Sequence, residues 1–263
     1  MKYYIDLLGG DDKSYRLRLD SPFKKENLKL YKSSVTGILI IGVSPFAMQL
    51  ATSIVQLIYN FSLKTYGGDL AIGAMATVNS ISMMFVMPAF GFVQAMQPIV
   101  GYNYGAKRYD RAKKTLKISL IAATIVFIAG YLLTQFTPEM LVGVFNKDPE
   151  LMELTINGLR KYTLAMPVIG ISIVGTYYIQ STGKAKMSML LSLLRQVIIL
   201  IPLIAILPRF FGVNGAWFAQ PIADVIASVV TGVVLFNEVR RYSKIKEDEL
   251  IEEVKVARTL GPD

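Results

Sequence analysis

Residues 118–136 read ISLIAATIVFIAGYLLTQF, and no charged side chain interrupts them. An apolar run of about 20 residues is long enough to cross the hydrocarbon core of a bilayer as a helix. This run is one of six long apolar runs with few charged residues, at Val35–Leu63, Leu70–Tyr104, Ile118–Phe136, Tyr162–Gly183, Met187–Leu207 and Val213–Phe236. The sequence therefore predicts an all-α integral membrane protein, a bundle of six transmembrane helices embedded in the lipid bilayer.

The amino-acid composition excludes several classes of function. Ala, Val, Ile, Leu, Met, Phe, Trp, Tyr and Cys make up 53% of the 263 residues, and the chain has neither Cys nor His. Disulfides, thiol catalysis and the commonest metal ligands are thereby excluded. The sequence shows no nucleophile–base pair and no phosphate-binding loop. We therefore expect neither an enzyme nor a resident metal or cofactor.

The net charge of +9 is distributed in a way that predicts topology. Lys and Arg number eight in Met1–Ser33, six in 105–117, two in 183–187 and six in 238–263, whereas the alternate loops hold five in total. Loops rich in Lys and Arg stay on the cytoplasmic side of a membrane. Six spans with both termini cytoplasmic satisfy this rule, and the dispersed charge argues against a nucleic-acid partner.

Three regions and several breaks follow from the same pattern. Residues 1–33 form a cytoplasmic lead-in or linker, residues 34–237 the six-helix lobe, and residues 238–263 a charged cytoplasmic tail with a solvated helix. Gly67 and Gly68 predict a tight turn between the first two spans. Pro88 and Pro98 are expected to bend the second span, and Pro98 to end its regular helix.

The longest outer loop carries a helix start. Asp148, Pro149 and Glu150 are typical of an N-cap, a proline in the first helical position and an acidic first turn. We expect a helix to begin there, to lie partly in the membrane interface and to continue into the fourth span. Pro167 is expected to kink it.

Polar residues within three spans recur at helical spacing, which places each set on one helix face. The sets are Gln49, Ser53, Gln56 and Asn60 in the first span, Ser172, Thr176 and Gln180 in the fourth, and Gln220, Asp224, Ser228 and Thr231 in the sixth. Such faces avoid lipid. They make hydrogen bonds between helices or line the cavity of a substrate pathway, and spacing alone favours neither.

Two ionisable residues lie within spans. Arg195 is roughly 12 Å from one end of the fifth span and Asp224 roughly 16 Å from the opposite end of the sixth, at 1.5 Å per residue. In a core about 30 Å thick the two depths nearly coincide, so an Arg195–Asp224 pair is expected. Charges inside a membrane are costly and often functional. The pair either serves a function or only locks two helices together, and Arg195 alternatively reaches toward the cytoplasm.

A longer motif follows the second span. Residues 91–114 read GFVQAMQPIVGYNYGAKRYDRAKK, and residues 180–224 read QSTGKAKMSMLLSLLRQVIILIPLIAILPRFFGVNGAWFAQPIAD. Both stretches resemble the multidrug and toxic compound extrusion (MATE) transporters, the second especially their MepA-like branch. The likeness extends over about residues 23–241 and matches only the C-terminal six-helix lobe of that family. The motif residues are Gly91, Gln94, Gln97, Pro98, Gly101, Gly105 and Arg111.

The resemblance implies secondary active efflux of organic cations and other drugs across a bacterial plasma membrane, driven by H⁺ or Na⁺. It also implies a partner, either an N-terminal six-helix lobe or a second copy. Some members carry a Glu in the helix matching the first span and an Asp in the one matching the fourth. This chain has Ser53 and apolar residues near Ile171 there. Asp224, the only carboxylate within a span, is thus the candidate for ion coupling.

Physical roles can be assigned to parts of the motif. Gly91, Gly101 and Gly105 are expected to permit close helix contact and a tight exit from the membrane. Gln94 and Gln97 line the inner mouth of the pathway or bond the helix break.

Two other interpretations compete with efflux. One is a truncated or scaffolding membrane lobe that does not transport. The other is a flippase of lipid precursors from the same superfamily, for which the expected basic groove is not evident, since Arg195 is the only basic residue within a span.

Overall fold

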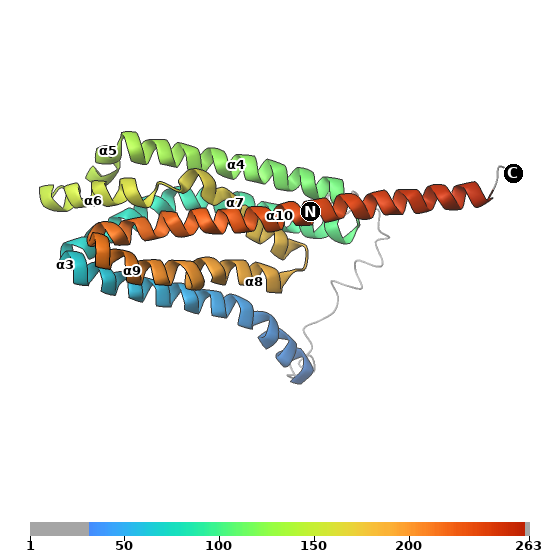
Figure 1. The fold of residues 1–263 in the computed structure, drawn as a ribbon, viewed down its shortest axis with the longest axis horizontal. Helices are drawn as coiled ribbons and strands as arrows, with labels where there is room; N and C mark the ends of the chain where they lie inside the picture. The colour runs from blue at the N-terminus through green and yellow to red at the C-terminus, as the bar shows by residue number, and fades with distance from the viewer. Residues whose placement is uncertain (1–31, 261–263) are drawn as a thin grey trace, which may run out of the picture. The chain divides into compact units, whose positions relative to one another are not determined.

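The computed structural model describes the backbone of residues 32–260 and the side chains of residues 46 and 48–241. The chain divides into two units, Met1–Pro45 and Phe46–Asp263. The helix bundle belongs to the second unit (Figure 1), and every contact given below joins residues of that unit. Residues 1–31 of the expected lead-in lie outside the described residues.

Helix α3, Lys32–Gly105, contains the first two expected spans. Gly68 divides it, with φ 69° and ψ −165°, in a region of backbone conformation that side-chain-bearing residues rarely adopt. The turn predicted at Gly67 and Gly68 is therefore confirmed. The residues on the two sides of Gly68 run back alongside each other (Figure 1), which makes α3 a helical hairpin.

The expectation that Pro98 ends the regular helix is wrong. Gly68 is the one non-helical residue within α3, and the helix continues through Pro88 and Pro98 to Gly105. Proline has a φ close to the helical value and removes only one backbone hydrogen bond. Unwinding the helix in lipid would leave several more polar groups without a partner, so continuing the helix costs less.

The following turn reverses the chain into α4, Tyr109–Phe136. Its left-handed residue is Lys107, at φ 56°, so the tight exit expected of Gly105 is made two residues later. Short helix α5, Pro138–Gly143, then leads to α6, Pro149–Tyr162. The Asp148 side chain accepts hydrogen bonds from the amides of Glu150 and Leu151, which confirms the predicted N-cap.

The fourth span is a broken helix. Helices α6 and α7, Met166–Ser181, meet at an angle of 57°. Pro167 lies in the first turn of α7, so the kink expected at this proline is confirmed. Thr134, Gln135 and Thr163 surround the break. The Gln135 amide donates to the carbonyl of Arg160 at 2.8 Å, and the two threonine hydroxyls are 3.0 Å apart.

The fifth span contains a segment that the sequence did not predict. It consists of α8, Ala185–Leu193, a π-helical segment η2, Leu194–Leu200, and α9, Ile201–Phe211. Pro202 follows directly and has no amide hydrogen to donate to the preceding turn. A widened turn accommodates such a proline without ending the helix.

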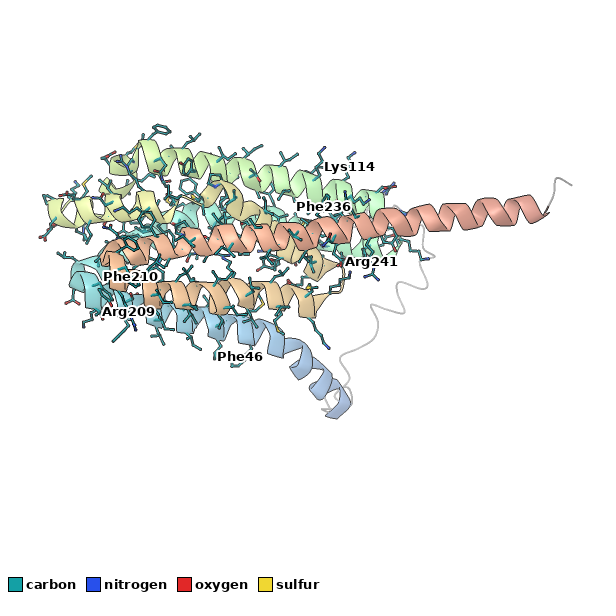
Figure 2. All side chains as sticks on the ribbon, viewed as in Figure 1. Phe46, Lys114, Arg209, Phe210, Phe236 and Arg241 are labelled. Carbon is teal, nitrogen blue, oxygen red and sulfur yellow. The ribbon has the colours of Figure 1, made fainter. Side chains whose placement is uncertain are left out.

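Helix α10, Val213–Leu260, forms the sixth span and continues through the charged tail, where a helix was expected. Four helical stretches are long and apolar enough to cross a membrane, and the bent α6–α7 pair adds a fifth. Since α3 is folded back at Gly68, the described residues supply the six expected spans. Lys114 and Arg241 lie at one end of the bundle and Arg209 at the other (Figure 2).

Two buried clusters hold the bundle together. One surrounds Tyr59, Leu63 and Trp217, and the other surrounds Phe127 and Tyr178. Gly158 of α6 admits Trp217, because a Cβ there would lie 2.8 Å from the Trp217 Cε2 atom. Close helix packing of this kind, with a small residue facing a large one, is typical of membrane proteins.

Candidate functional site

The buried charge pair lies where η2 faces α10. Arg195 Nε donates to Asp224 Oδ1 at 2.8 Å, so the two residues expected at matching depths are in direct contact. The Asp224 side chain is 5% exposed and that of Arg195 is 22% exposed. The guanidinium thus lies between the carboxylate and the surface of the lobe.

Gln220 completes the coordination of the carboxylate. Its amide nitrogen lies 3.2 Å from Asp224 Oδ1 and 3.1 Å from Asp224 Oδ2. The two residues are one helical turn apart on α10, which is the spacing at which side chains meet. Asp224 therefore receives donors from two helices, as a buried carboxylate requires.

The other polar residues of α10 are also buried. Ser228 donates to the carbonyl of Val168 at 3.0 Å, linking α10 to the first turn of α7, and Thr231 is 1% exposed. On α7, Ser172 and Thr176 are buried whereas Gln180 is exposed. The buried side chains face the interior of the bundle, and the hydrogen bond from Ser228 joins two helices as a structural contact.

The polar stripe of α3, unlike that of α10, lies mostly on the outside of the lobe. Gln49, Ser53 and Gln56 are exposed, and Asn60 is half-buried. The opposite face of α3 holds the helix in place: the Tyr59 hydroxyl donates to the Ala216 carbonyl at 2.5 Å, and Ser62 contacts the Ile204 carbonyl. These contacts with the rest of the lobe hold the helix in place, while its polar stripe faces outward.

Two residues that the sequence analysis missed join the stripe to the charge pair. Gln196, the neighbour of Arg195 in η2, donates to the hydroxyl of Thr52 on α3 at 3.4 Å. Consecutive residues of η2 therefore reach opposite ways, Arg195 to α10 and Gln196 to α3. No sequence signal distinguished Gln196, because its partnership depends on the rotation of the π-helical turn.

The site does not have the composition of a metal centre. Among the residues that the structure describes, no three Asp, Glu, His or Cys side chains come together. The charged centre of the lobe is one carboxylate held by one guanidinium and one amide.

Comparison with known proteins gives the family. The family model described as MatE matches residues 45–206, more than half of the chain. The chain belongs to the MatE family. The proteins it resembles in this family are transporters.

Curated relatives include the multidrug export proteins MepA of Staphylococcus haemolyticus (strain JCSC1435) and Staphylococcus aureus (strain MSSA476). The first is 22% identical over 230 residues, which cover 88% of this chain and 50% of the relative. The second is 23% identical over 229 residues, which cover 86% of this chain and 50% of the relative. The chain spans about half the length of the curated relatives it matches.

Solved structures show the same likeness. A multidrug resistance MATE family transporter of the MOP superfamily, in its inward-facing conformation, aligns with a TM-score of 0.76 at 17% identity, over 83% of this chain and 51% of that one. The MATE multidrug transporter DinF-BH aligns with a TM-score of 0.69 at 38% identity, over 79% of this chain and 47% of that one. The six-helix bundle thus has the fold of one half of a MATE transporter.

The motif expected from the resemblance lies at the end of α3 and the start of α4. A Cβ on Gly101 would lie 3.4 Å from the Ser181 carbonyl, so this glycine does allow a close approach to α7. A Cβ on Gly91 or Gly105 would meet nothing within 4 Å, and the close contacts expected there are not made within the lobe. Gln94 and Arg111 are exposed and Gln97 is half-buried.

Proposed function

We propose that this chain acts as the C-terminal lobe of a multidrug efflux transporter, exporting organic cations in exchange for H⁺ or Na⁺. The observation that carries this proposal is the exposed polar stripe of α3. Gln49, Ser53 and Gln56 lie within a membrane-spanning helix and face out of the lobe. Lipid is a poor partner for such a face, whereas a wet pathway between two lobes is a good one.

The half-length match supports a partner lobe. MepA relatives are about twice as long as the stretch they share with this chain. Transporters with parallel repeats place the substrate near the midplane, between two halves related by an axis along the membrane normal. We infer that this lobe works together with an N-terminal six-helix lobe or with a second copy of itself. The pathway would lie against Gln49, Ser53, Gln56, Asn60 and neighbouring residues of α7 and α10.

Asp224 is our candidate for coupling. It is the only acid within a span, and its partners Arg195 and Gln220 hold it near the depth at which transporters bind ions. A cation or proton that reaches Asp224 would release Arg195, whose side chain is already partly exposed. This release would alter the contact between η2 and α10, and through Gln196 that between η2 and α3.

A dye-efflux assay tests the function. Bacteria without their own drug pumps would express the chain alone, with a separately encoded N-terminal lobe of a relative, or with that lobe and Asp224→Asn. We expect accumulation of a cationic dye to fall when the unsubstituted chain is paired with that lobe, and not with Asp224→Asn. A fall with the chain alone would identify two copies of the chain as the working unit. If the paired chain is in the membrane and changes the accumulation of no cationic dye, a scaffolding role is correct and the proposal is wrong.

The proposed orientation places both termini in the cytoplasm of a bacterial plasma membrane. Single cysteines at Asp69 and Lys114 report on it, because the native chain has none. Both positions are exposed, and neither has a left-handed backbone, unlike Gly68. An impermeant thiol reagent added outside should label Asp69→Cys and not Lys114→Cys. The reverse pattern would show that the orientation is inverted.

A further inference from the structure

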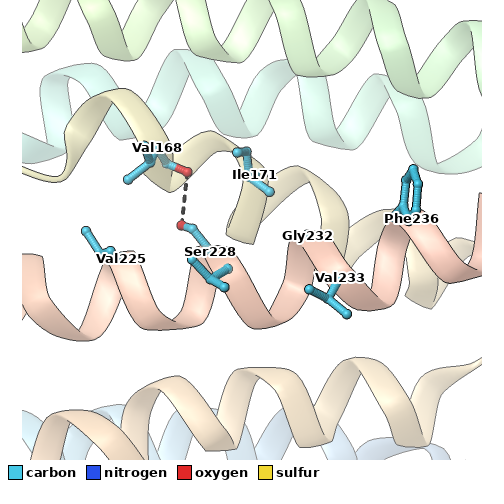
Figure 3. Close-up of a pocket in the computed structure, with 8 residues that line it drawn as sticks. Val168, Ile171, Val225, Ser228, Gly232, Val233 and Phe236 are labelled. Carbon is cyan, nitrogen blue, oxygen red and sulfur yellow. Dashed lines mark hydrogen bonds between the residues drawn. The ribbon is translucent and has the colours of Figure 1, made fainter.

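A groove runs along α10 on its side toward α7 (Figure 3). It has a volume of about 380 Å³ and is lined by Val168, Ile171, Val225, Ser228, Val229, Gly232, Val233 and Phe236. Val225, Val229 and Gly232 each follow a member of the buried polar stripe by one residue, and Ser228 belongs to both sets. The groove therefore lies in the membrane-spanning part of the helix, and it is separate from the Arg195–Asp224 pair.

Gly232 lines the groove and has no side chain to fill it. It lies in the middle of α10, where glycine is less stable than alanine because it loses more backbone freedom on folding. An added Cβ would meet only Ile171 Cγ2, at 3.5 Å, which is ordinary van der Waals contact. Helix packing therefore does not demand a glycine here. The space left by the missing side chain can hold part of a molecule from outside this lobe.

The lining selects a hydrocarbon occupant. All its members but Ser228 and Gly232 are aliphatic or aromatic, and the Ser228 hydroxyl is already bonded to the Val168 carbonyl. Asp224 is one turn away, but Arg195 and Gln220 occupy its oxygens. An organic cation would find no negative group in the groove, whereas a lipid acyl chain requires none.

Positive charge stands at one end of the groove. The Arg240 guanidinium lies 4.2 Å from the centroid of the Phe236 ring, and Arg241 follows it and is exposed. The neighbouring acid, Glu238, forms an ion pair with Lys184. From Val225 to Phe236 the groove extends roughly 16 Å, at 1.5 Å per residue. An acyl chain of that length would bring a phosphate close to Arg240.

We propose that the groove between α7 and α10 binds one acyl chain of an anionic phospholipid, and that Arg240 binds its phosphate. The site lies beside the charge pair and does not depend on the transport function proposed above. Arginines near an anionic headgroup strengthen lipid binding by about fivefold each. A concave apolar channel adds selectivity for the chain over the ordinary lipid surface of the bundle.

Photolabelling tests the proposal in the full chain. The purified chain would be reconstituted in phosphatidylcholine nanodiscs containing a trace of phosphatidylglycerol or phosphatidylcholine with a diazirine in the acyl chain. Mass spectrometry would locate the label. We expect phosphatidylglycerol to label residues 168–171 and 225–236 about fivefold more than phosphatidylcholine, given Arg240 at the headgroup.

Matched variants separate a site from general lipid contact. Val229→Trp fills the groove and should reduce the labelling severalfold, whereas Ile125→Trp changes a residue of α4 with the same 62% exposure and should not. Arg240→Gln should remove the preference for phosphatidylglycerol, and Arg209→Gln, at the opposite end, should keep it (Figure 2). A melting measurement on each variant would verify that it is folded.

Four outcomes would overturn the proposal. Equal labelling by the two lipids would mean general lipid contact only, as would an equal effect of Ile125→Trp and Val229→Trp. Displacement of the probe by a cationic dye would assign the groove to drugs. A chemical crosslink between two chains through the groove, lost with Val229→Trp, would assign it to a second copy.

Discussion

The polar stripe of α10 and the polar stripe of α3 share the same helical spacing, yet α10 buries its stripe and α3 exposes its own. Gln220, Asp224, Ser228 and Thr231 are at most 9% exposed. Gln49, Ser53 and Gln56 on α3 are all exposed. Spacing along the sequence identifies which side chains share a helix face. Only burial shows whether that face packs against another helix of the lobe.

The difference separates two kinds of role. The α10 stripe is satisfied within the lobe, by Arg195 and by the Val168 carbonyl. Changes there should alter the stability of the lobe. The α3 stripe lacks a cover among the described residues of the lobe apart from the contact of Thr52 with Gln196, so changes there should alter what the lobe does with a partner. Apart from Asp224, the candidate for coupling, substitutions in the two stripes are therefore expected to separate stability from transport.

The largest effect is expected from breaking the charge pair. Arg195→Met leaves the Asp224 carboxylate buried with Gln220 as its remaining donor. Breaking a buried pair in this way costs about 3–5 kcal/mol of stability. Asp224→Asn should cost less, since the Arg195 side chain is 22% exposed and can turn its charge toward water. Thermal unfolding of the purified variants in detergent measures both effects.

The double variant is the control for this prediction. Arg195→Met with Asp224→Asn leaves no buried charge, and it should recover most of the stability lost by Arg195→Met alone. Losses that simply add would show that the two side chains do not stabilise each other. Wild-type stability of both single variants would show that the pair does not stabilise the fold. The α10 stripe would then contribute no more to stability than the α3 stripe does.

The sequence predicted the spans and the pair because both depend on local composition and chain order. Apolar runs place six helices, and consecutive antiparallel spans bring Arg195 and Asp224 to one depth. Gly68 marks the reversal of α3 because few other residues adopt its conformation. These inferences need only periodicity, hydropathy and the geometry of a single helix.

A smaller effect is expected on the buried face of α3. Tyr59→Phe removes the hydroxyl that donates to the Ala216 carbonyl and keeps the ring within its cluster. Loss of one such hydrogen bond costs about 1 kcal/mol. A decrease in melting temperature smaller than that of Arg195→Met is expected. If the two decreases are equal, the charge pair contributes no more than an ordinary hydrogen bond.

Ser228→Ala should have a still smaller effect. It removes the bond to the Val168 carbonyl, and hydrogen bonds between membrane helices contribute about 0.6 kcal/mol on average. The variant should melt close to the native chain and retain efflux when paired. A severe loss of stability would show that this bond, and not the charge pair, fixes α10 against its neighbours.

Other features escaped prediction for physical reasons. The π-helical turn of η2 rotates Gln196 toward α3. The spacing of apolar residues along the sequence does not indicate where a helical turn is widened. The continuity of α3 through Pro98 depends on the cost of unwinding a helix in lipid, which exceeds the cost of one missing bond. Whether a polar stripe is buried depends on how each helix is rotated in the bundle, which spacing within one helix does not determine.

The smallest effect on stability, and a large one on transport, is expected from the α3 stripe. Gln56→Leu replaces an exposed polar side chain with an apolar one of similar size. Substitutions at exposed positions usually change stability by less than about 0.5 kcal/mol, so the melting temperature should be nearly native. In cells that contain the partner lobe, dye efflux should fall severalfold, because the polar lining of the pathway has been interrupted.

The neighbouring residue supplies the control, since Leu57 is 70% exposed and points to the side of the stripe. Leu57→Ala changes the shape of the same helix turn without removing a polar group, and it should leave efflux close to native. If Leu57→Ala reduces efflux as much as Gln56→Leu, the effect comes from contact with the partner and not from polarity. If Gln56→Leu melts far below the native chain, the α3 stripe supports the fold, and the distinction between the two stripes does not hold.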